Sequence, residues 1–203
     1  MRAVIIANGK ITDFEKINKL IRDDDYIICA DGGYDYAEKL GAVPNIIIGD
    51  MDSVKSEDLQ LDKIVFPAKK DLTDSEIVLE YAAEKGFDEL LLLGFTGGRA
   101  DHMLTNIMLL TKYPHIDITI ADEYSEIFLA KNENVIKGIK GTIISVIPIN
   151  GDLKGVTTKG LEYPLFDEDL YFGTGRGVSN VMLSDECVIK IKSGTGLIIK
   201  STD

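Results

Sequence analysis

The chain has 203 residues, enough for one large domain or two small ones. Its net charge of −12 argues against nucleic acid as a partner, because binding to a phosphate backbone requires a basic surface. No apolar run approaches the roughly 18 residues of a membrane span, and no signal-peptide pattern is present. We therefore expect a cytoplasmic protein that does not engage a membrane.

The two cysteines, Cys29 and Cys187, lie inside apolar runs that are far apart in the sequence. Their surroundings favour buried free thiols in a reducing compartment over a disulfide. Neither cysteine lies in a spacing typical of zinc ligands.

The first part of the chain, to about residue 121, alternates short apolar runs with helical patterns. The runs are rich in Ile, Val and Leu without alternation, which is typical of strands covered on both faces. Expected strands are 2–7, 26–30, 45–48, 63–66, 89–94 and 117–121, and expected helices are 14–21, 34–40, 73–86 and 102–112. This alternation predicts an α/β domain with a mostly parallel sheet.

From about Ser125 the pattern changes to short β-branched runs between glycine-rich turns. Expected strands are 142–147, 178–183, 187–191 and 197–200. The lack of a long helical period favours a compact antiparallel β domain. We expect the boundary in the polar segment 131–141, giving domains of residues 1–130 and 131–203.

A series of acidic or glycine-rich clusters follows the apolar runs of the first domain. They are Asp31-Gly32-Gly33, Gly49-Asp50-Met51-Asp52-Ser53, Asp71-Leu72-Thr73-Asp74 and Gly97-Gly98-Arg99-Ala100-Asp101-His102. Because each follows a strand, we expect them to emerge at the same edge of the sheet. Carboxylates gathered beside glycine turns and an arginine indicate a site for Mg²⁺ and a polyphosphate.

Asp50 and Asp52 are candidate metal ligands, because residues two apart in an extended chain project to the same side. Mg²⁺ prefers one or two carboxylates together with phosphate oxygens. The alternative is a polar loop in which the aspartates and Ser53 bond to nearby amides. The spacing alone leaves both interpretations open.

The cluster at Asp71 and Asp74 has a strong structural interpretation. Thr73 and Glu76 form the pattern of a capping box, and Asp74 in the first turn complements the helix dipole. A metal-binding role for Asp74 depends on this helix start lying beside the loop that holds Asp50.

Gly97, Gly98 and Arg99 suit an anion, since glycines allow a close backbone approach and arginine binds phosphate through two hydrogen bonds. The sequence is not that of a P-loop. Structural alternatives are that Asp101 caps the following helix and that His102 is a surface residue. For Asp31, too, the structural alternative is that it caps the helix that follows it.

Taken in order and spacing, these motifs resemble the thiamine pyrophosphokinase family over essentially the whole chain. Thr157-Thr158-Lys159-Gly160-Leu161 and Gly177-Val178-Ser179-Asn180 complete the resemblance. It implies an N-terminal α/β domain, a C-terminal antiparallel β-sandwich and a homodimer with active sites between subunits. It also implies transfer of the diphosphate of ATP to the hydroxyl of thiamine, giving thiamine diphosphate and AMP, with Mg²⁺ required.

The resemblance also implies a role for each candidate residue. The implied metal ligands are Asp50, Asp52 and Asp74, and Asp71 is the next candidate for this role. Residues facing ATP are Asp31, Gly32, Gly97, Gly98, Arg99 and Asp101. Thiamine is expected at Ser179 and Asn180, and Tyr163 takes the place of a tryptophan that stacks on thiamine in some members. Tyrosine offers less stacking area, and an ordinary aromatic at a strand end is the alternative for Tyr163.

In the expected mechanism the thiamine hydroxyl attacks the β-phosphorus of ATP in line and expels AMP, so catalysis is mostly positioning and charge neutralisation. Arg99 would hold phosphate oxygens. Asp71 or Asp101 would accept the hydroxyl proton, and the sequence does not choose between them.

Two other functions stay open at this point. A Mg²⁺-dependent phosphohydrolase could use an Asp-x-Asp nucleophile, although that motif usually follows the first strand and here it follows the third. A non-catalytic sensor of thiamine or nucleotide could keep the same scaffold, although the acidic set is intact.

Overall fold

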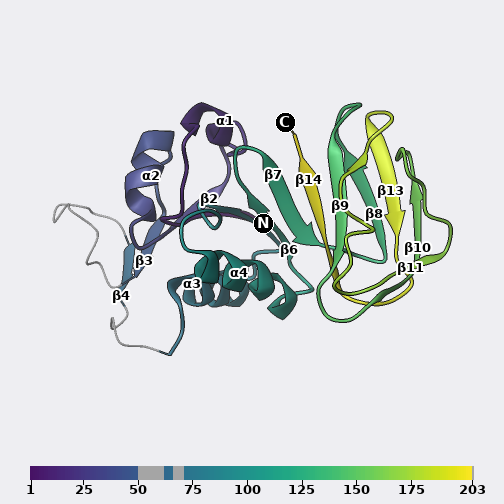
Figure 1. Cartoon of the computed structure of the whole chain (residues 1–203). Helices are drawn as coiled ribbons and strands as arrows, with labels where there is room; N and C mark the ends of the chain where they lie inside the picture. The colour runs from purple at the N-terminus through teal and green to yellow at the C-terminus, as the bar shows by residue number, and fades with distance from the viewer. Residues whose placement is uncertain (50–61, 66–70, 203) are drawn as a thin grey trace. The chain divides into compact units, whose positions relative to one another are not determined.

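The structure is a computed structural model that describes residues 1–49, 62–65 and 71–202. The chain forms two compact units, Met1–Glu123 and Tyr124–Asp203. The first is a parallel α/β unit and the second is antiparallel, which confirms the expected fold class (Figure 1).

The first unit is built on a parallel sheet. Its strands are β1 (Arg2–Ile6), β2 (Tyr26–Ala30), β3 (Ile46–Gly49), β4 (Asp62–Val65), β5 (Glu89–Leu93) and β6 (Asp117–Ala121). They are ordered β6-β5-β1-β2-β3-β4. In the centre, Ile5 of β1 lies in register with Ile28 of β2 and Leu92 of β5. These side chains are fully buried, which explains why the runs are apolar without alternation.

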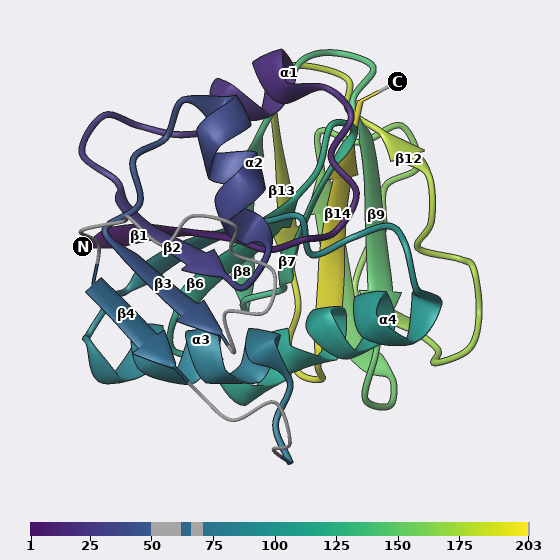
Figure 2. The same ribbon diagram turned by 90° about the vertical axis from the view of Figure 1, so that its left-hand side faces the viewer.

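Helices cover both faces of this sheet. They are α1 (Phe14–Asn18), α2 (Gly33–Leu40), α3 (Asp74–Glu84) and α4 (Ala100–Leu109), followed by the 3₁₀ turn η1 (Leu110–Lys112). Helices α1 and α2 lie on one face, whereas α3 and α4 lie on the other (Figure 2). Helix α1 is shorter than expected because Leu20 and Ile21 continue as a turn, although both still pack on the core.

The helix ends confirm one expected cap and correct two others. Thr73 Oγ1 accepts a hydrogen bond from the Glu76 amide at 3.2 Å, and Glu76 Oε2 accepts one from the Thr73 amide at 3.0 Å, so the capping box exists. The structural alternatives for Asp31 and Asp101, in which each caps a helix, were wrong. Gly32 is the N-cap residue of α2 and Arg99 that of α4, and neither makes a side-chain cap bond.

The second unit is an antiparallel β-sandwich. Its strands are β7 (Ser125–Leu129), β8 (Glu133–Lys137), β9 (Ile143–Pro148), β10 (Leu153–Lys159), β11 (Glu168–Leu170), β12 (Asn180–Val181), β13 (Glu186–Lys190) and β14 (Gly196–Ser201). One sheet is ordered β12-β9-β14-β7 and the other β11-β10-β13-β8. Ile144 and Ile198 of the first sheet share a core with Val156 and Ile189 of the second.

The structure adds strands in this unit that the sequence analysis did not anticipate, namely β7, β8, β10 and β11. Strand β8 lies in the segment 131–141, and its residues alternate between exposed and buried positions. Strand β12 is two residues long, much shorter than the expected 178–183.

Both cysteines are free and buried, as expected. Burial raises the pKa of the Cys29 thiol to about 12 and that of Cys187, on β13, to about 11. Both thiols are therefore protonated and unreactive at neutral pH. Across the described ranges, no helix combines the length and apolar character needed to span a bilayer.

Two glycines bring the loops after β1 and β5 together. The Gly9 amide donates to the Gly94 carbonyl at 2.8 Å, and a Cβ on Gly9 would lie 2.2 Å from that oxygen. Gly94 has a φ of 72°, and a Cβ there would lie 2.3 Å from the Ala7 carbonyl oxygen. Neither position can accept a side chain without moving backbone.

We predict that Gly94→Ala destabilises the protein more than Gly41→Ala. Both residues have a positive φ, which costs a non-glycine residue about 1–2 kcal/mol. At Gly94 the new Cβ also overlaps backbone atoms, which costs about 1–3 kcal/mol more. At Gly41 nothing lies within 4 Å of the new Cβ, so this cost is absent. Urea denaturation measures both losses, and equal losses would contradict the tight crossing.

Candidate functional site

A pocket of about 640 Å³ lies in the first unit where β1, β2 and β5 end. Its walls come from the segments 7–10, 30–31 and 94–99, at or after the ends of those strands, together with residues 72–75 around the start of α3. Tyr36 of α2 and three residues of α4 complete the lining. The carboxyl edge of the parallel sheet therefore carries the pocket, as is usual for ligand sites in such sheets.

The candidate residues of the first unit fall into three groups. Those lining this pocket are Asp31, Asp74, Gly97, Gly98, Arg99 and His102. Gly32, Asp71 and Asp101 lie outside the lining, and both aspartates are exposed. Asp50 and Asp52 lie outside the described residues, so the expected metal ligands can be placed only in part.

Asp31 has a strained backbone at the end of β2. Its φ is 44°, a left-handed conformation that residues other than glycine adopt infrequently. The Asp31 amide donates to the Ile48 carbonyl at 2.9 Å, and a Cβ on Gly49 would lie 3.0 Å from the Asp31 Cα. The end of β3 is thus packed directly against the residue that brings its carboxylate to the pocket.

Asp74 is the first residue of α3, and the capping box of Thr73 and Glu76 fixes this helix start. Asp74 and Asp31 therefore provide two carboxylates to one pocket, from separate segments. Among the residues that the structure describes, no three acidic, histidine or cysteine side chains gather closely enough to hold a metal ion. Two carboxylates suit Mg²⁺ when phosphate oxygens supply further ligands.

Gly97 and Gly98 form the turn between β5 and α4, with φ values of 75° and 65°. Both are exposed, and nothing lies within 4 Å of a Cβ on Gly98. Consecutive residues of this kind present backbone amides in a concave arrangement that suits an anion.

The Arg99 guanidinium is held by Asp101 through two hydrogen bonds. Nε donates to Oδ1 at 3.1 Å and Nη2 donates to Oδ2 at 2.5 Å. The Arg99 bonds, helped by the His102 amide, lower the pKa of Asp101 to about 2. The same pair raises the pKa of Arg99. A phosphate that binds Arg99 must therefore compete with Asp101.

Several pocket residues were missed by sequence reasoning. Asn8, Gly9 and Lys10 line the pocket directly after β1. They follow an apolar strand, as the acidic and glycine-rich clusters of the first domain do. Their position after a strand was therefore the signal that could have found them. Asn106 of α4 also lines the pocket, and its Nδ2 donates to the Phe95 carbonyl at 3.0 Å. No pattern near Asn106 in the sequence indicates this contact.

The second unit has its own pocket, of about 350 Å³. It is lined by residues 161–165, 176–178 and 180, together with Ile144, Val146 and Thr158. Tyr163 and Asn180 are thus brought together there. Ser179 lies outside the lining, and its amide donates to Ser145 Oγ at 3.0 Å.

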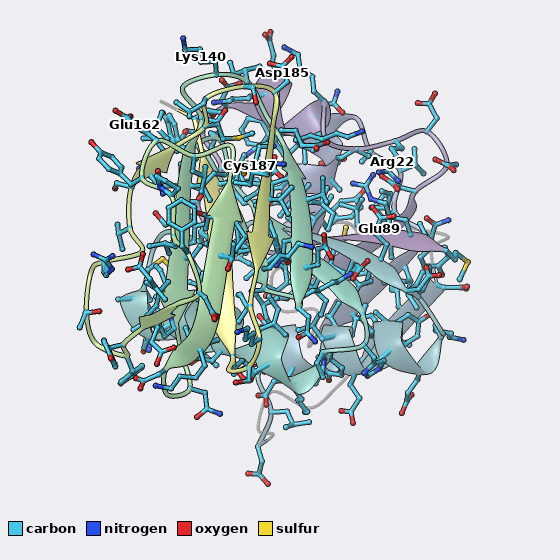
Figure 3. The ribbon with its side chains drawn as sticks, turned by 90° about the vertical axis from the view of Figure 1, so that its right-hand side faces the viewer. Arg22, Glu89, Lys140, Glu162, Asp185 and Cys187 are labelled. Atoms are coloured by element: carbon cyan, nitrogen blue, oxygen red, sulfur yellow. The ribbon has the colours of Figure 1, made fainter. Side chains whose placement is uncertain are left out.

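Asn180 fixes the backbone of Tyr163. The Tyr163 amide donates to Asn180 Oδ1 at 3.0 Å, and Asn180 Nδ2 donates to the Tyr163 carbonyl at 2.7 Å. The Tyr163 side chain is left 65% exposed. Glu162 (labelled in Figure 3) adds a carboxylate to the lining of this pocket.

Two family models match the chain. The one described as thiamin pyrophosphokinase, catalytic domain, matches residues 17–121, and the one described as thiamin pyrophosphokinase, vitamin B1 binding domain, matches residues 126–198. The matches fall on the first and the second structural unit, respectively.

Curated relatives point to the same family. A thiamine pyrophosphokinase of Bacillus subtilis (strain 168) is 33% identical over 173 residues, covering 80% of this chain and 81% of the relative. Thiamine pyrophosphokinase 1 of Oryza sativa subsp. japonica is 27% identical over 172 residues, covering 76% of this chain and 64% of the plant protein.

Solved structures share the fold. The crystal structure of thiamine pyrophosphokinase from Bacillus subtilis has a TM-score of 0.90 at 28% identity, and the alignment covers 100% of both chains. That of thiamin pyrophosphokinase from Geobacillus thermodenitrificans has a TM-score of 0.87 at 26% identity, covering 100% of this chain and 98% of the other.

We predict that Arg99→Gln raises the pKa of Asp101 from about 2 toward its ordinary value of 3.8. A carboxylate whose pKa is lowered by folding stabilises the protein above its unfolded-state pKa, and this contribution is lost as pH falls through the folded-state pKa. The variant, in which Asp101 titrates close to its ordinary value, should therefore lack this contribution.

A pH titration followed by carboxyl-carbon NMR measures this change. Asp152, whose pKa is lowered by the Phe172 amide and Lys154, is the internal control and should not move. An Asp101 midpoint that stays near pH 2 in the variant would rule out control by Arg99.

Proposed function

The chain belongs to the thiamin pyrophosphokinase family, and we propose that its two pockets bind the two substrates of one diphosphate transfer. The diphosphate of ATP passes to the hydroxyl of thiamine, giving thiamine diphosphate and AMP. ATP binds in the pocket of the first unit and thiamine in that of the second. The observation that carries the proposal is the meeting of Asp31, Asp74 and Arg99 with the glycine turn around one pocket.

Mg²⁺ is the proposed cofactor, with Asp74, Asp50 and Asp52 as its protein ligands. Asp74 lines the ATP pocket, and Asp50 follows Gly49, which packs against Asp31. The donors are hard carboxylate oxygens, which suits this cation. When bound, Mg²⁺ would neutralise phosphate charge and make the β-phosphorus more electrophilic.

The glycine turn and Arg99 hold the triphosphate. Amides at Gly97 and Gly98 receive phosphate oxygens, and the Arg99 guanidinium moves from Asp101 to the phosphate. Release from Arg99 raises the pKa of Asp101, so its carboxylate becomes a better proton acceptor. This places Asp101 ahead of Asp71 as the proposed base.

The chemical step is then an in-line displacement. Asp101 takes the proton of the thiamine hydroxyl as the oxygen forms a bond to the β-phosphorus. The bond from the β-phosphorus to the oxygen that bridges it to the α-phosphorus breaks, and AMP leaves with that oxygen. The residues of this chain mainly position the groups and balance their charge.

Thiamine is proposed to bind at Tyr163, Ser179 and Asn180. A pocket of about 350 Å³ matches the size of a small heterocyclic ligand. The exposed Tyr163 ring offers a stacking surface, and Asn180 holds its backbone in place. The carboxylate of Glu162 attracts the positive charge of the thiazolium ring.

A homodimer is part of the same proposal. Tyr163, Phe166, Tyr171 and Phe172 of the second unit are each more than half exposed, which suits a surface that a second copy covers. Sedimentation at micromolar concentration should therefore give twice the chain mass of 22.3 kDa, and a mass of one chain would argue against the dimer.

We predict that Asp74→Asn lowers the turnover number by about a hundredfold or more, because a lost metal ligand removes several kcal/mol of transition-state stabilisation. The measurement is AMP formation from ATP, thiamine and Mg²⁺. Asp23→Asn is the matched control, since Asp23 is exposed and precedes β2 at the opposite edge of the sheet.

The same assay tests the whole proposal. AMP that depends on thiamine supports the transfer reaction. Inorganic phosphate released without thiamine would indicate a phosphohydrolase, and binding without turnover would indicate a sensor. Unchanged turnover in Asp74→Asn would remove Asp74 from the metal site.

We predict that Tyr163→Ala raises the KM for thiamine by about tenfold, since an aromatic contact contributes about 0.5–1.5 kcal/mol beyond its buried area. Tyr163→Phe keeps the ring and should keep the KM. The KM for ATP is the internal control and should not change. Equal thiamine KM values for the alanine and phenylalanine variants would exclude stacking.

A further inference from the structure

Lys10 brings a positive charge to the ATP pocket beside the glycine turn. It lines the pocket, and its Cβ lies 3.0 Å from the place of a Cβ on Gly97. Within the described part of the chain, no carboxylate forms an ion pair with Lys10. Arg99, which lines the same pocket, is already paired with Asp101. Lys10 is therefore available to a polyanion without breaking an existing pair.

The segment that carries Lys10 is fixed on its N-terminal side by β5. The Ala7 amide donates to the Leu93 carbonyl at 2.9 Å, and the Gly9 amide donates to the Gly94 carbonyl at 2.8 Å. These bonds continue the parallel pairing of β1 with β5 past the end of both strands. The backbone immediately before Lys10 thus has a defined position.

The C-terminal side of the same segment is fixed by Glu123. Its Oε1 accepts hydrogen bonds from the Thr12 amide, from Thr12 Oγ1 at 3.0 Å and from the Asp13 amide at 3.0 Å. Glu123 is only 7% exposed. Burial alone would raise its pKa, but these hydrogen bonds outweigh that effect and lower it, so the carboxylate stays charged at neutral pH.

The neighbouring residue, Asp122, fixes the adjacent loop of the pocket, which follows β5. Asp122 Oδ2 accepts a hydrogen bond from Thr96 Oγ1 at 3.0 Å, and Thr96 lies in the loop that continues into Gly97. Asp122 and Glu123 directly follow β6, which pairs with β5. One dipeptide therefore holds the loops that follow β5 and β1.

We propose that Lys10 binds the triphosphate and that Glu123 is a positioning residue that acts through Lys10. The inference rests on the proposed function, because it assumes that this pocket holds ATP. The Lys10 ammonium supplies a mobile point charge, whereas Arg99 supplies a planar group with fixed geometry. Glu123 touches no substrate and sets the position from which Lys10 reaches the phosphates.

The first test compares binding of Mg²⁺ with a non-hydrolysable ATP analogue by calorimetry, without thiamine. Lys10→Met should raise the Kd about tenfold, the value of one hydrogen bond to a charged group. Lys19→Met is the matched control, since Lys19 is exposed after α1 and lies outside the pocket lining. The Kd of this variant for the analogue should stay at the wild-type value. An unchanged Kd in Lys10→Met would overturn the proposal.

The second test asks whether Glu123 acts through Lys10. Glu123→Ala should raise the KM for ATP and leave the KM for thiamine unchanged, and Glu123→Gln, which keeps an acceptor oxygen, should recover most of the loss. In the Lys10→Met background, Glu123→Ala should change the ATP Kd by less than about twofold, because coupled residues are not additive.

A purely structural role for Glu123 would give a different result. The effects of Glu123→Ala and Lys10→Met would then multiply, and that outcome would overturn the positioning role. If Glu123→Ala does not fold, Thr12→Ala, which removes the hydroxyl that donates to Glu123 Oε1, takes its place in the cycle, with thermal unfolding recorded for each variant.

The wild-type protein separates failure of this inference from failure of the proposed function. Thiamine-dependent AMP formation and analogue binding by the wild type, with no effect of Lys10→Met, would refute the inference alone. A wild type that neither binds the analogue nor forms AMP would refute both.

Discussion

The close backbone crossing of Gly9 and Gly94 is the contact on which the pocket of the first unit depends. Strands β1 and β5 are parallel neighbours, so their following loops leave the sheet side by side. The 2.8 Å bond between the two glycines holds these loops together, and a side chain on either one would meet backbone atoms. Lys10 and the Gly97–Gly98 turn, which come next in each loop, therefore face the same space. Without this crossing, the groups proposed to bind phosphate would not share one pocket.

Local charges, rather than the net charge of the protein, decide whether a polyanion binds here. Two unit charges about 4 Å apart interact by about 4 kcal/mol at an effective dielectric constant of 20. Charges beyond a Debye length of about 8 Å are largely screened at physiological ionic strength. The net charge of −12 is therefore compatible with ATP binding when cations lie at the phosphates. Lys10, Arg99 and a bound Mg²⁺ would supply them against the carboxylates of Asp31 and Asp74.

The parallel sheet could be predicted because its strands are continuous apolar runs. The ends of β2 and β6 match the expected limits, β1 and β5 differ by one residue at one end, and β3 and β4 differ by one residue at both ends. The sandwich was harder to predict. Strand β8 has only two apolar residues, and its buried positions are Asn134 and Ile136 while Val135 is exposed. Strand β10 contains a glycine and an irregular register. Such strands are fixed by their partners more than by local sequence.

The residues of the candidate site also divide into those that the sequence could indicate and those that it could not. That Asp31, Asp74 and Arg99 line one pocket could be predicted, because each follows a strand or begins a helix, and strand ends gather at one edge. The bond between Arg99 and Asp101 was not foreseen, because it depends on side-chain conformation. Glu123 could not be found at all, since its contacts are 110 and 111 residues away in the sequence. Only the folded sheet brings those segments together.

The most direct test of the account is a crystal structure with Mg²⁺ and a non-hydrolysable ATP analogue. The account predicts the triphosphate against Gly97, Gly98 and Arg99, with the cation bound by Asp74 and by Asp50 or Asp52. Coordinates that place Asp74 too far from Asp50 and Asp52 to share a cation, or the triphosphate outside this pocket, would contradict it.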